Sequence, residues 1–189
     1  MLRSTVQVEA ALCPSLPYHT MAKSKLSTVQ LQLILISMAL AAAAAATTHL
    51  QFYMHDIVTA TAESPATGVR VARGTTPLPG DPNTYFGDIH VIDDPLTEVG
   101  RAQGSYPFAD QQELAVIFSL NFVFTAGKHN GSYLVVNGKD AFFDEVRELA
   151  VIGGAGSFRG ATGYALLTTH YFNSTTKNAV VKIDMHLRM

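Results

Sequence analysis

Cysteine is nearly absent from this 189-residue sequence, which contains only Cys13 and has no tryptophan. A lone cysteine forms no disulfide within the chain and cannot supply the thiolates of a structural zinc site. Charge is also sparse, because only 15% of the residues are Asp, Glu, Lys or Arg. The 13 basic residues are outnumbered by 15 acidic ones, so the chain lacks the basic surface of a nucleic-acid-binding protein. A chain of this length is expected to form one domain with, at most, an appendage.

Common motifs for metals, nucleotides and serine catalysis are missing as well. No G-x-S-x-G occurs, and Ser119 and Ser157 have no triad context. The run "GGAGSFRG" is a turn and not a dinucleotide loop, because Arg159 replaces the third glycine and no helix follows. We therefore predict no cofactor. We also predict no metal site, because five of the seven histidines are far apart in the sequence, without H-x-H or HExxH spacing: His55, His90, His129, His170 and His186.

The N-terminal part has the pattern of a secretory signal. Lys23 and Lys25 precede an apolar run of 18 residues that ends in six successive alanines. A basic start, an apolar centre and small residues at the end are typical of a cleaved signal peptide. We predict this signal over residues 21–46, with cleavage near Ala45 or Ala46. A membrane anchor is the alternative on length, but the alanines make the second half of the run only weakly hydrophobic.

Residues 1–20 fit neither a signal nor a domain. They contain Cys13 and show no periodicity. We interpret Met21 as the true start, with residues 1–20 as an extension of the gene model or a disordered segment. The domain is then 47–189, with 143 residues and no cysteine. Removal of residues 1–46 takes away three basic residues and one acidic one, which leaves 10 basic and 14 acidic residues and a net charge of −4.

A secreted chain without disulfides must be stabilised by its core and by association with other copies. We expect it in the extracellular space of the cell wall, with no membrane attachment once the signal is removed. Two N-x-S/T sequons, at Asn130 and Asn173, could carry glycans there.

Alternation of apolar and polar residues predicts strands from Leu50 onward. The residues that share the apolar face are clearest in three segments: Leu50, Phe52, Met54, Asp56 and Val58; Leu114, Val116, Phe118, Leu120, Phe122 and Phe124; and Val181, Ile183, Met185 and Leu187. Four other segments alternate in the same way: 85–93, 131–136, 148–154 and 161–172. The segments between them contain turn signals: "PLPGDPN", "DDPLT", "AGKHNG", "GGAG" and "NSTTKN".

These short strands, with no competing amphipathic helix, predict an all-β, antiparallel barrel or sandwich. We favour a barrel, because closure removes exposed strand edges. A barrel of eight strands would have room for one small ligand. The segment 113–127 offers apolar residues on both faces. We therefore expect a homo-oligomer packed against this strand, with coverage by a loop as the alternative.

Asp56 is the most informative single residue, since it shares the inward face with Phe52 and Met54. A buried carboxyl has a raised pKa, which suits a general acid near neutral pH. The alternative is a structural carboxylate that accepts backbone hydrogen bonds, and the sequence alone does not separate the two.

The segment at residues 138–149, "GKDAFFDEVREL", also has two interpretations. It is either a helix or two strand ends that bring Asp140 and Arg147 together.

Several motifs, in this order, resemble the plant dirigent family: "FYMHDI", "VIDDPLT", "VGRAQGSY", "NFVFTAGKHNGS" and "VRELAVIGGAGSFRGATGYA". The resemblance covers Leu50 to Leu187. It implies a secreted, eight-stranded antiparallel barrel that associates as a trimer, alternatively a dimer. It also implies a role in phenoxy-radical coupling, in which an external laccase or peroxidase oxidises a monolignol such as coniferyl alcohol. The dirigent protein then fixes the geometry of coupling and yields an optically active lignan, without an oxidative centre of its own.

The resemblance assigns the pocket one residue at a time. Asp56, Asp140 and Arg147 match the family's acids and arginine, which are thought to protonate and orient a quinone-methide intermediate. Tyr106 matches the tyrosine after the R-A-Q-G motif, which stacks on or hydrogen-bonds a phenol. We expect Asp56→Asn and Asp140→Asn to impair function while sparing the fold. The resemblance also favours two strands over a helix at 138–149, with a turn through Phe143–Asp144.

One departure from the family lies after "DDPLT", where only Glu98 separates Thr97 from Val99. Family members usually have a longer loop there, which we expect near the pocket mouth. Two other roles remain open: a dirigent-like enzyme that forms or closes a ring through a quinone methide, and a scaffold for lignin deposition. A passive carrier of phenolics is a further alternative, in which Asp56, Asp140 and Arg147 are dispensable.

Overall fold

The computed structural model describes residues 27–43 and 47–189. Helix α1 (Thr28–Ala43) lies within the predicted signal and belongs to a separate compact unit from the strands that follow. Among the described residues, no helix is both long and apolar enough to cross a membrane. The predicted extension over residues 1–20, the basic start of the signal and the expected cleavage position all lie outside the described residues.

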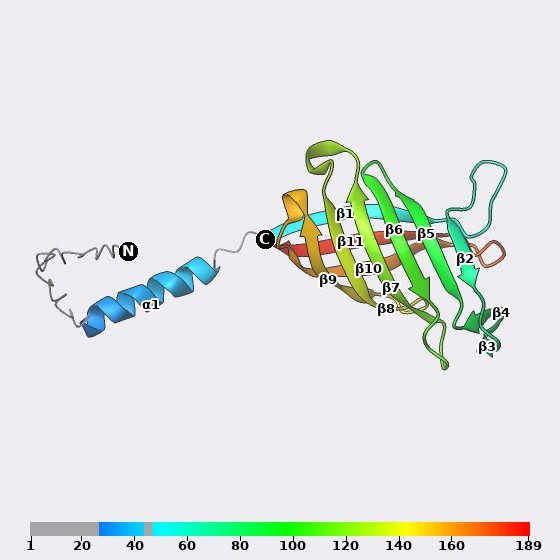
Figure 1. The fold of residues 1–189 in the computed structure, drawn as a ribbon, viewed down its shortest axis with the longest axis horizontal. Helices are drawn as coiled ribbons and strands as arrows, with labels where there is room; N and C mark the ends of the chain where they lie inside the picture. Colours follow the sequence, from blue (N-terminus) through cyan, green and yellow to red (C-terminus); the bar gives the residue numbers. More distant parts are fainter. Residues whose placement is uncertain (1–26, 44–46) are drawn as a thin grey trace, which may run out of the picture. The chain divides into compact units, whose positions relative to one another are not determined.

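Eleven strands and two short 3-10 helices follow α1 in the described part of the chain (Figure 1). In chain order they are β1 (Thr47–Asp56), β2 (Gly68–Ala72), β3 (Thr76–Leu78), β4 (Asp81–Phe86), β5 (Ile89–Leu96), β6 (Gly100–Pro107), β7 (Ala115–Phe124), η1 (Gly127–His129), β8 (Tyr133–Ala141), β9 (Arg147–Ala155), η2 (Gly156–Phe158), β10 (Thr162–Phe172) and β11 (Ala179–Arg188).

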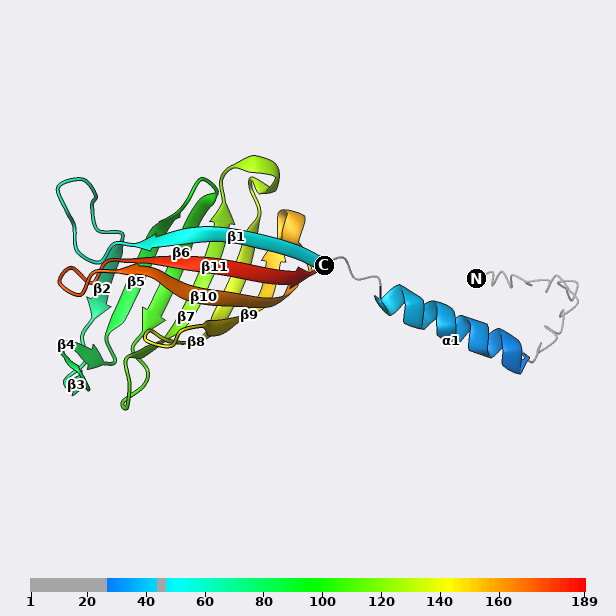
Figure 2. The ribbon, with the colours of Figure 1, turned by 180° about the vertical axis from the view of Figure 1, so that it is seen from behind.

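Eight of these strands form a closed antiparallel barrel, as predicted from the sequence. The sheet runs from β1 through β11, β10, β9, β8, β7 and β6 to β5, and β1 pairs with β5 at Met54 and Leu96 to close it. The first and last strands are neighbours over their full length, with Thr47 opposite Arg188 (Figure 2). The short strand β2 adds to β5, and β3 and β4 form a separate hairpin.

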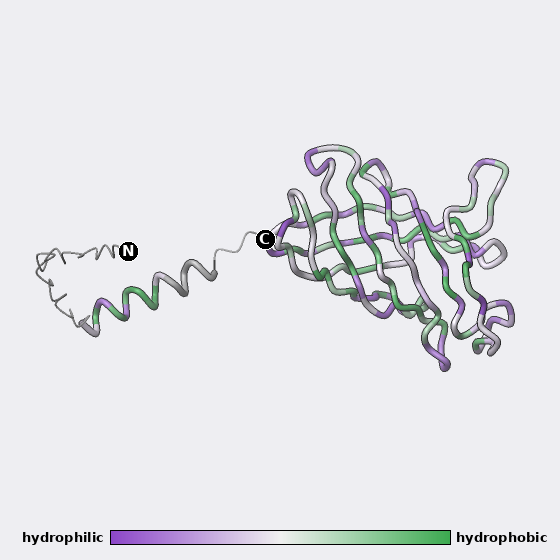
Figure 3. The backbone as a smooth tube through the Cα atoms, viewed as in Figure 1, coloured by the Kyte–Doolittle hydropathy of each residue, from purple (hydrophilic) through white to green (hydrophobic). Residues whose placement is uncertain are grey.

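The barrel interior is filled by the alternating apolar residues. Green and purple segments follow each other along the strands in Figure 3, as expected for strands with one buried face. The predicted inward residues of β7 and β11 are buried: Val116, Phe118, Leu120, Phe122, Phe124, Val181, Ile183, Met185 and Leu187. On β1, Phe52 and Met54 are buried and Leu50 packs against the core.

The segment at residues 138–149 is two strands joined by a turn. Strand β8 ends at Ala141, and β9 begins at Arg147, as the resemblance implied. The Asp144 N–H donates to the Ala141 carbonyl at 3.0 Å, which closes a turn and not a helix. The helical spacing of the apolar residues was therefore coincidental.

Two expectations about strand boundaries were wrong. Segment 85–93 is not one strand, because Gly87 has a positive φ of 87° and separates β4 from β5. The "DDPL" residues are not a turn but the second half of β5. The signal "PLPGDPN" does contain a turn, that of the β3–β4 hairpin. Strand β6 was not predicted, because it does not follow the apolar alternation: glycines occupy positions 100 and 104.

The short turn at Thr97–Val99 joins β5 to β6. The Thr97 N–H donates to the Tyr53 carbonyl on β1 at 2.9 Å, and Leu96, just before the turn, pairs with Met54. The turn therefore lies beside the part of β1 that leads to Asp56. That it lies near the pocket mouth stays a prediction. The turn is held by His55, whose Nε2 is 2.8 Å from Thr97 Oγ1.

Candidate functional site

The four pocket residues predicted from the sequence lie at strand ends on the same end of the barrel. Asp56 ends β1, Tyr106 lies near the end of β6, Asp140 near the end of β8, and Arg147 begins β9. Because neighbouring strands run in opposite directions, these positions all fall at one end. Tyr106, Asp140 and Arg147 are buried, and the Oδ1 atom of Asp56 is enclosed although the residue as a whole is partly exposed.

A second carboxyl, that of Asp94, lies opposite Asp56 across the seam of the barrel. Met54 on β1 pairs with Leu96 on β5 in antiparallel register. Asp56 lies two residues after Met54, and the same register places it opposite Asp94, two residues before Leu96. Asp94 is fully buried, and the Thr67 hydroxyl donates to its Oδ1 at 2.6 Å. Among the described residues, Asp94 Oδ2 and Asp56 Oδ1 have no hydrogen-bond partner.

Burial and mutual repulsion keep this pair of carboxyls from ionising together. Burial raises the pKa of Asp56 to about 6, although the nearby Tyr106 hydroxyl lowers it in part. Burial and then the charge of Asp56 raise the pKa of Asp94 to about 8. Since interacting acids titrate as a unit, the pair holds one proton at neutral pH. This arrangement offers both a proton donor and a proton acceptor at one place.

Tyr106 is fixed beside the pair by a cluster of aromatic rings. Its ring stacks on His90, with centroids 5.1 Å apart and planes at 16°, and it meets Phe118 edge-on at 5.3 Å. Burial, followed by the charges of Asp56 and Asp94, raises the pKa of Tyr106 well above its usual value. The phenol therefore stays protonated and is oriented toward the Asp56 carboxyl.

Asp140 and Arg147 form a buried ion pair that links β8 to β9. Arg147 Nε donates to Asp140 Oδ1 at 2.7 Å, and Arg147 Nη1 donates to Thr169 Oγ1 on β10, also at 2.7 Å. Burial raises the pKa of Asp140, although the charge and hydrogen bond of Arg147 act in the opposite direction. The structure thus brings the two residues together, as the strand–turn–strand interpretation required. A surface depression of about 210 Å³ over this hairpin includes Arg147 in its lining.

Asp94, Thr67 and Thr169 were not among the residues singled out from the sequence. A signal for Asp94 was present, because it alternates with Ile92 and Leu96, both of which are buried. This is the same argument that identified Asp56. The two threonines carry no such signal, since their roles depend on contacts between distant strands.

The sequence prediction of no metal site also missed one group of residues. His49, Asp184 and His186 converge on the outer face of β1 and β11, with their ligand atoms within 4.8 Å of one another. His49 was not considered, and the pairing of the first strand with the last is not visible in sequence spacing.

The two sequons differ in their surroundings. Asn130 is exposed after η1, and the Ser132 hydroxyl of its sequon is buried and accepts the Ser157 N–H. Asn173 is partly buried, and its Oδ1 accepts the N–H groups of Thr175 and Thr176. An N-glycan is attached to the amide nitrogen Nδ2, so these hydrogen bonds to Oδ1 do not block attachment at Asn173. Asn130 is the more exposed of the two residues.

Comparison with known proteins agrees with this geometry. The family model described as "Dirigent-like protein" matches residues 47–188. The chain is 43% identical to dirigent protein 21 of Arabidopsis thaliana over 148 residues, which cover 74% of this chain and 76% of that protein. It is 36% identical to pterocarpan synthase 1 of Glycine max over 151 residues, or 73% of this chain and 76% of that protein.

A solved structure has the same fold. The structure of a pterocarpan synthase dirigent protein aligns with a TM-score of 0.66 and 33% identity, over 75% of this chain and 87% of that one. The family-model match over residues 47–188 includes all four predicted pocket residues. The chain therefore belongs to the dirigent family.

Proposed function

We propose that this protein binds phenoxy radicals of a monolignol such as coniferyl alcohol and directs their coupling to an optically active lignan. An external laccase or peroxidase removes the electron and proton from each monolignol, and the barrel then fixes which faces meet. A preference of ten to one between coupling geometries requires only about 1.4 kcal/mol. Positioning of two planar partners is sufficient for an effect of this size.

The observation that carries the proposal is the carboxyl pair of Asp56 and Asp94 beside Tyr106. Coupling through the side-chain carbons forms one C–C bond and leaves a quinone methide on each half. A protonated carboxyl can donate its proton to the quinone-methide oxygen, which restores the phenol. The side-chain hydroxyl then forms the ring C–O bond and gives its proton to a carboxylate. One proton is donated and one is received, so a pair that shares a proton is suited to both steps.

Arg147 supplies a fixed positive charge at the same end of the barrel. Its bonds to Asp140 and Thr169 hold the guanidinium in one orientation. A guanidinium in a site from which water is excluded stabilises developing negative charge on a phenolic oxygen. We therefore assign Arg147 to orienting the substrate phenolate, and Asp140 to holding Arg147.

A second candidate is a synthase that closes a ring without an oxidant. Two observations favour it. Asp94 has a pKa raised to about 8, so this acid is mostly protonated at neutral pH, and two proteins similar to this chain are named as pterocarpan synthases. In this reaction the acid protonates a benzylic hydroxyl, which leaves as water while a phenol loses its proton to give a quinone methide. A second phenolic hydroxyl then adds to the quinone methide and returns its proton.

One experiment with two arms separates the candidates. In the first arm, coniferyl alcohol and a laccase react with and without the purified protein, and chiral chromatography measures the enantiomeric excess of the lignan. In the second arm, a preformed benzylic alcohol precursor is incubated with the protein and no oxidant. An excess in the first arm supports the coupling role, and turnover in the second supports the synthase. A racemate together with no turnover would contradict both.

We propose in addition that the protein acts outside the cell, after removal of residues 1–46. The basic and apolar pattern of residues 21–46 and the sequon at the exposed Asn130 support this. Detection of the protein in wall fluid, with Thr47 or a neighbouring residue as its first residue, is the expected result. Retention inside the cell with residues 21–46 intact would contradict it.

A further inference from the structure

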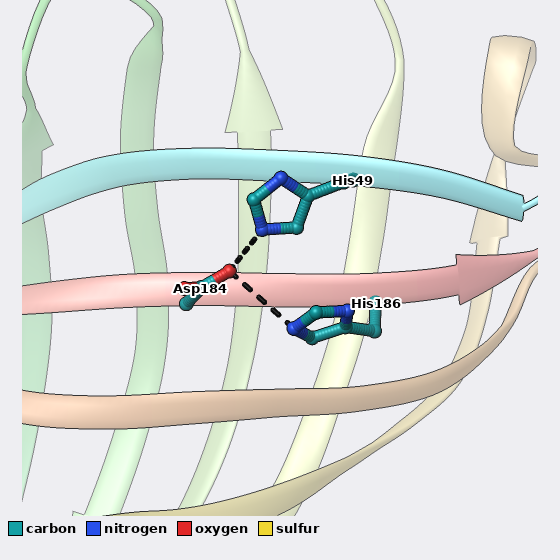
Figure 4. Close-up of side chains that lie close together, drawn as sticks. All are labelled: His49, Asp184 and His186. Atoms are coloured by element: carbon teal, nitrogen blue, oxygen red, sulfur yellow. Dashed lines mark hydrogen bonds and ion pairs between the residues drawn. The ribbon is translucent and has the colours of Figure 1, made fainter.

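The outer face of the barrel carries a group of three side chains that the proposed chemistry does not use. His49 on β1 is directly opposite His186 on β11, and Asp184 is two residues before His186. All three therefore point to the same side of the sheet. Figure 4 shows both imidazoles turned toward the Asp184 carboxylate.

Both imidazoles approach the same carboxylate oxygen. His49 Nε2 is in direct contact with Asp184 Oδ1, and His186 Nε2 lies 3.5 Å from the same oxygen. The centroids of the two imidazole rings are 4.8 Å apart. One protonated histidine would satisfy the carboxylate, yet two Nε2 atoms approach a single oxygen from different strands.

We propose that His49, Asp184 and His186 form a binding site for a divalent transition-metal ion, with Zn²⁺ as the best fit. Zinc binds imidazole nitrogen and carboxylate oxygen at about 2.0–2.2 Å, which places the ligand atoms about 3.3 Å apart in a tetrahedral site. The three ligand atoms already lie within 4.8 Å of one another. Small side-chain rotations on this accessible surface bring them to the required spacing. The fourth position faces solvent and is available to water.

The neighbouring residues support this geometry. Tyr164 on β10 stacks on His186, with ring centroids 4.8 Å apart and planes at 19°, and so holds that imidazole in place. Lys182 lies 3.9 Å from Asp184 Oδ2, the oxygen on the other side of the carboxylate. Its charge limits affinity but leaves Oδ1 available.

The site would join the first and last strands of the barrel. A bound ion therefore links the two ends of the domain across the β1–β11 pair. Binding to the folded state alone raises thermal stability in proportion to the logarithm of ion concentration. This effect gives a readout that is independent of any reaction with phenols.

Calorimetric titration of the purified, tag-free protein with ZnCl₂ tests the proposal. We expect saturable binding of one ion per chain, and a loss of affinity of at least about tenfold in His49→Gln and in His186→Gln. His170→Gln is the matched control, because His170 is also exposed on a barrel strand. It should bind as the wild type does. Mg²⁺ should not compete, since it prefers oxygen ligands.

Two further measurements keep the result interpretable if one variant is poorly folded. The visible spectrum of the Co²⁺-loaded protein should report four-coordinate metal and should be lost in Asp184→Asn. The melting temperature of the wild type, but not of the His49→Gln and His186→Gln variants, should rise with added Zn²⁺. Absence of saturable binding in the wild type, or equal binding in the histidine variants, would overturn the proposal.

Discussion

At the scale of single residues, the properties of the pocket depend on what surrounds each carboxyl. Asp94 and Asp56 lie opposite each other in a site that burial makes unfavourable for charge. Asp93, the neighbour of Asp94 in sequence, faces solvent, where a hydrogen bond from Arg101 lowers its pKa. Adjacent aspartates on one strand therefore have opposite shifts, because successive side chains point to opposite faces.

The raised pKa of Asp94 predicts how stability varies with pH. Its folded pKa of about 8 exceeds the unfolded value of about 3.9, so the folded state holds a proton that the unfolded state releases. Stability therefore decreases as pH rises between these values. Asp94→Asn removes this dependence. The free energy of unfolding of the variant, taken relative to the wild type, should therefore be at least about 2 kcal/mol higher at about pH 9 than at about pH 5.

Urea unfolding at the two pH values measures the effect. Asp93→Asn is the matched control and should show no such gain, because the pKa of Asp93 is lowered in the fold. Equal pH slopes for the wild type and Asp94→Asn would show that Asp94 is ionised at neutral pH, contrary to our description.

Gly68 provides a test of the pocket that leaves the fold intact. A Cβ at this position would lie 3.5 Å from Asp56 Oδ1 and 3.8 Å from the Tyr106 hydroxyl, with no closer contact than 3.4 Å. We expect Gly68→Ala to reduce the enantiomeric excess of the coupled product at least about threefold, while the melting temperature changes little. Gly153→Ala is the control, because a Cβ there meets nothing within 4 Å. An unchanged enantiomeric excess in Gly68→Ala would show that the space beside Asp56 and Tyr106 takes no part in the reaction.

At the scale of secondary-structure elements, strand pairing creates the ion pair between β8 and β9. The structure changes our expectation for Asp140→Asn, which was to spare the fold. Loss of one partner leaves Arg147 buried without its counter-charge, and such a change typically costs about 3–5 kcal/mol. Asp140 is thus a poorer choice than Asp56 for separating function from stability.

A double-mutant cycle measures this coupling. Asp140→Leu and Arg147→Met should each destabilise the protein by about 3–5 kcal/mol, whereas the double variant should be close to the wild type in stability. Urea unfolding of the four proteins gives the interaction energy. Strictly additive losses would mean that the two side chains do not depend on each other.

The glycines of β6 explain why this strand escaped the sequence pattern. A Cβ at Gly104 would lie 2.1 Å from the Ser119 carbonyl oxygen on β7. The close approach of β6 and β7 therefore requires glycine. We expect Gly104→Ala to destabilise the protein by about 3 kcal/mol or more, as measured by urea unfolding. A cost similar to that of Gly153→Ala would show that the two strands separate easily.

At the scale of the whole molecule, exposed valines on β2 and β5 bear on the expected homo-oligomer. Val69 and Val91 are cross-strand partners and are 58% and 47% exposed. Val71 and Ile117 add to the exposed apolar surface. We expect light scattering of the purified protein to give the mass of a trimer, alternatively a dimer. A monomer at micromolar concentration would contradict this expectation.

Much of the barrel could be predicted from the sequence, because alternation identifies a buried face wherever apolar residues repeat every second position. The method worked for β7 and β11 and placed Asp56 correctly. It failed for β6, where glycine replaces the apolar residues, and at Gly87, where one positive φ ends a strand. The register between paired strands could not be predicted either. The pairing of β1 with β5 and β11 brings Asp94 to Asp56 and His49 to His186, and single-strand periodicity carries no information about it.

The account depends most directly on the proton shared by Asp56 and Asp94. Carbon-13 labelling of the aspartate carboxyls allows each one to be followed by NMR from about pH 4 to about pH 9, with Asp56→Asn and Asp94→Asn used for assignment. We predict two titrations, one at about 6 and one at about 8. If both carboxyls titrate near the ordinary aspartate value of about 3.9, the pair is fully ionised at neutral pH and cannot supply the proposed acid.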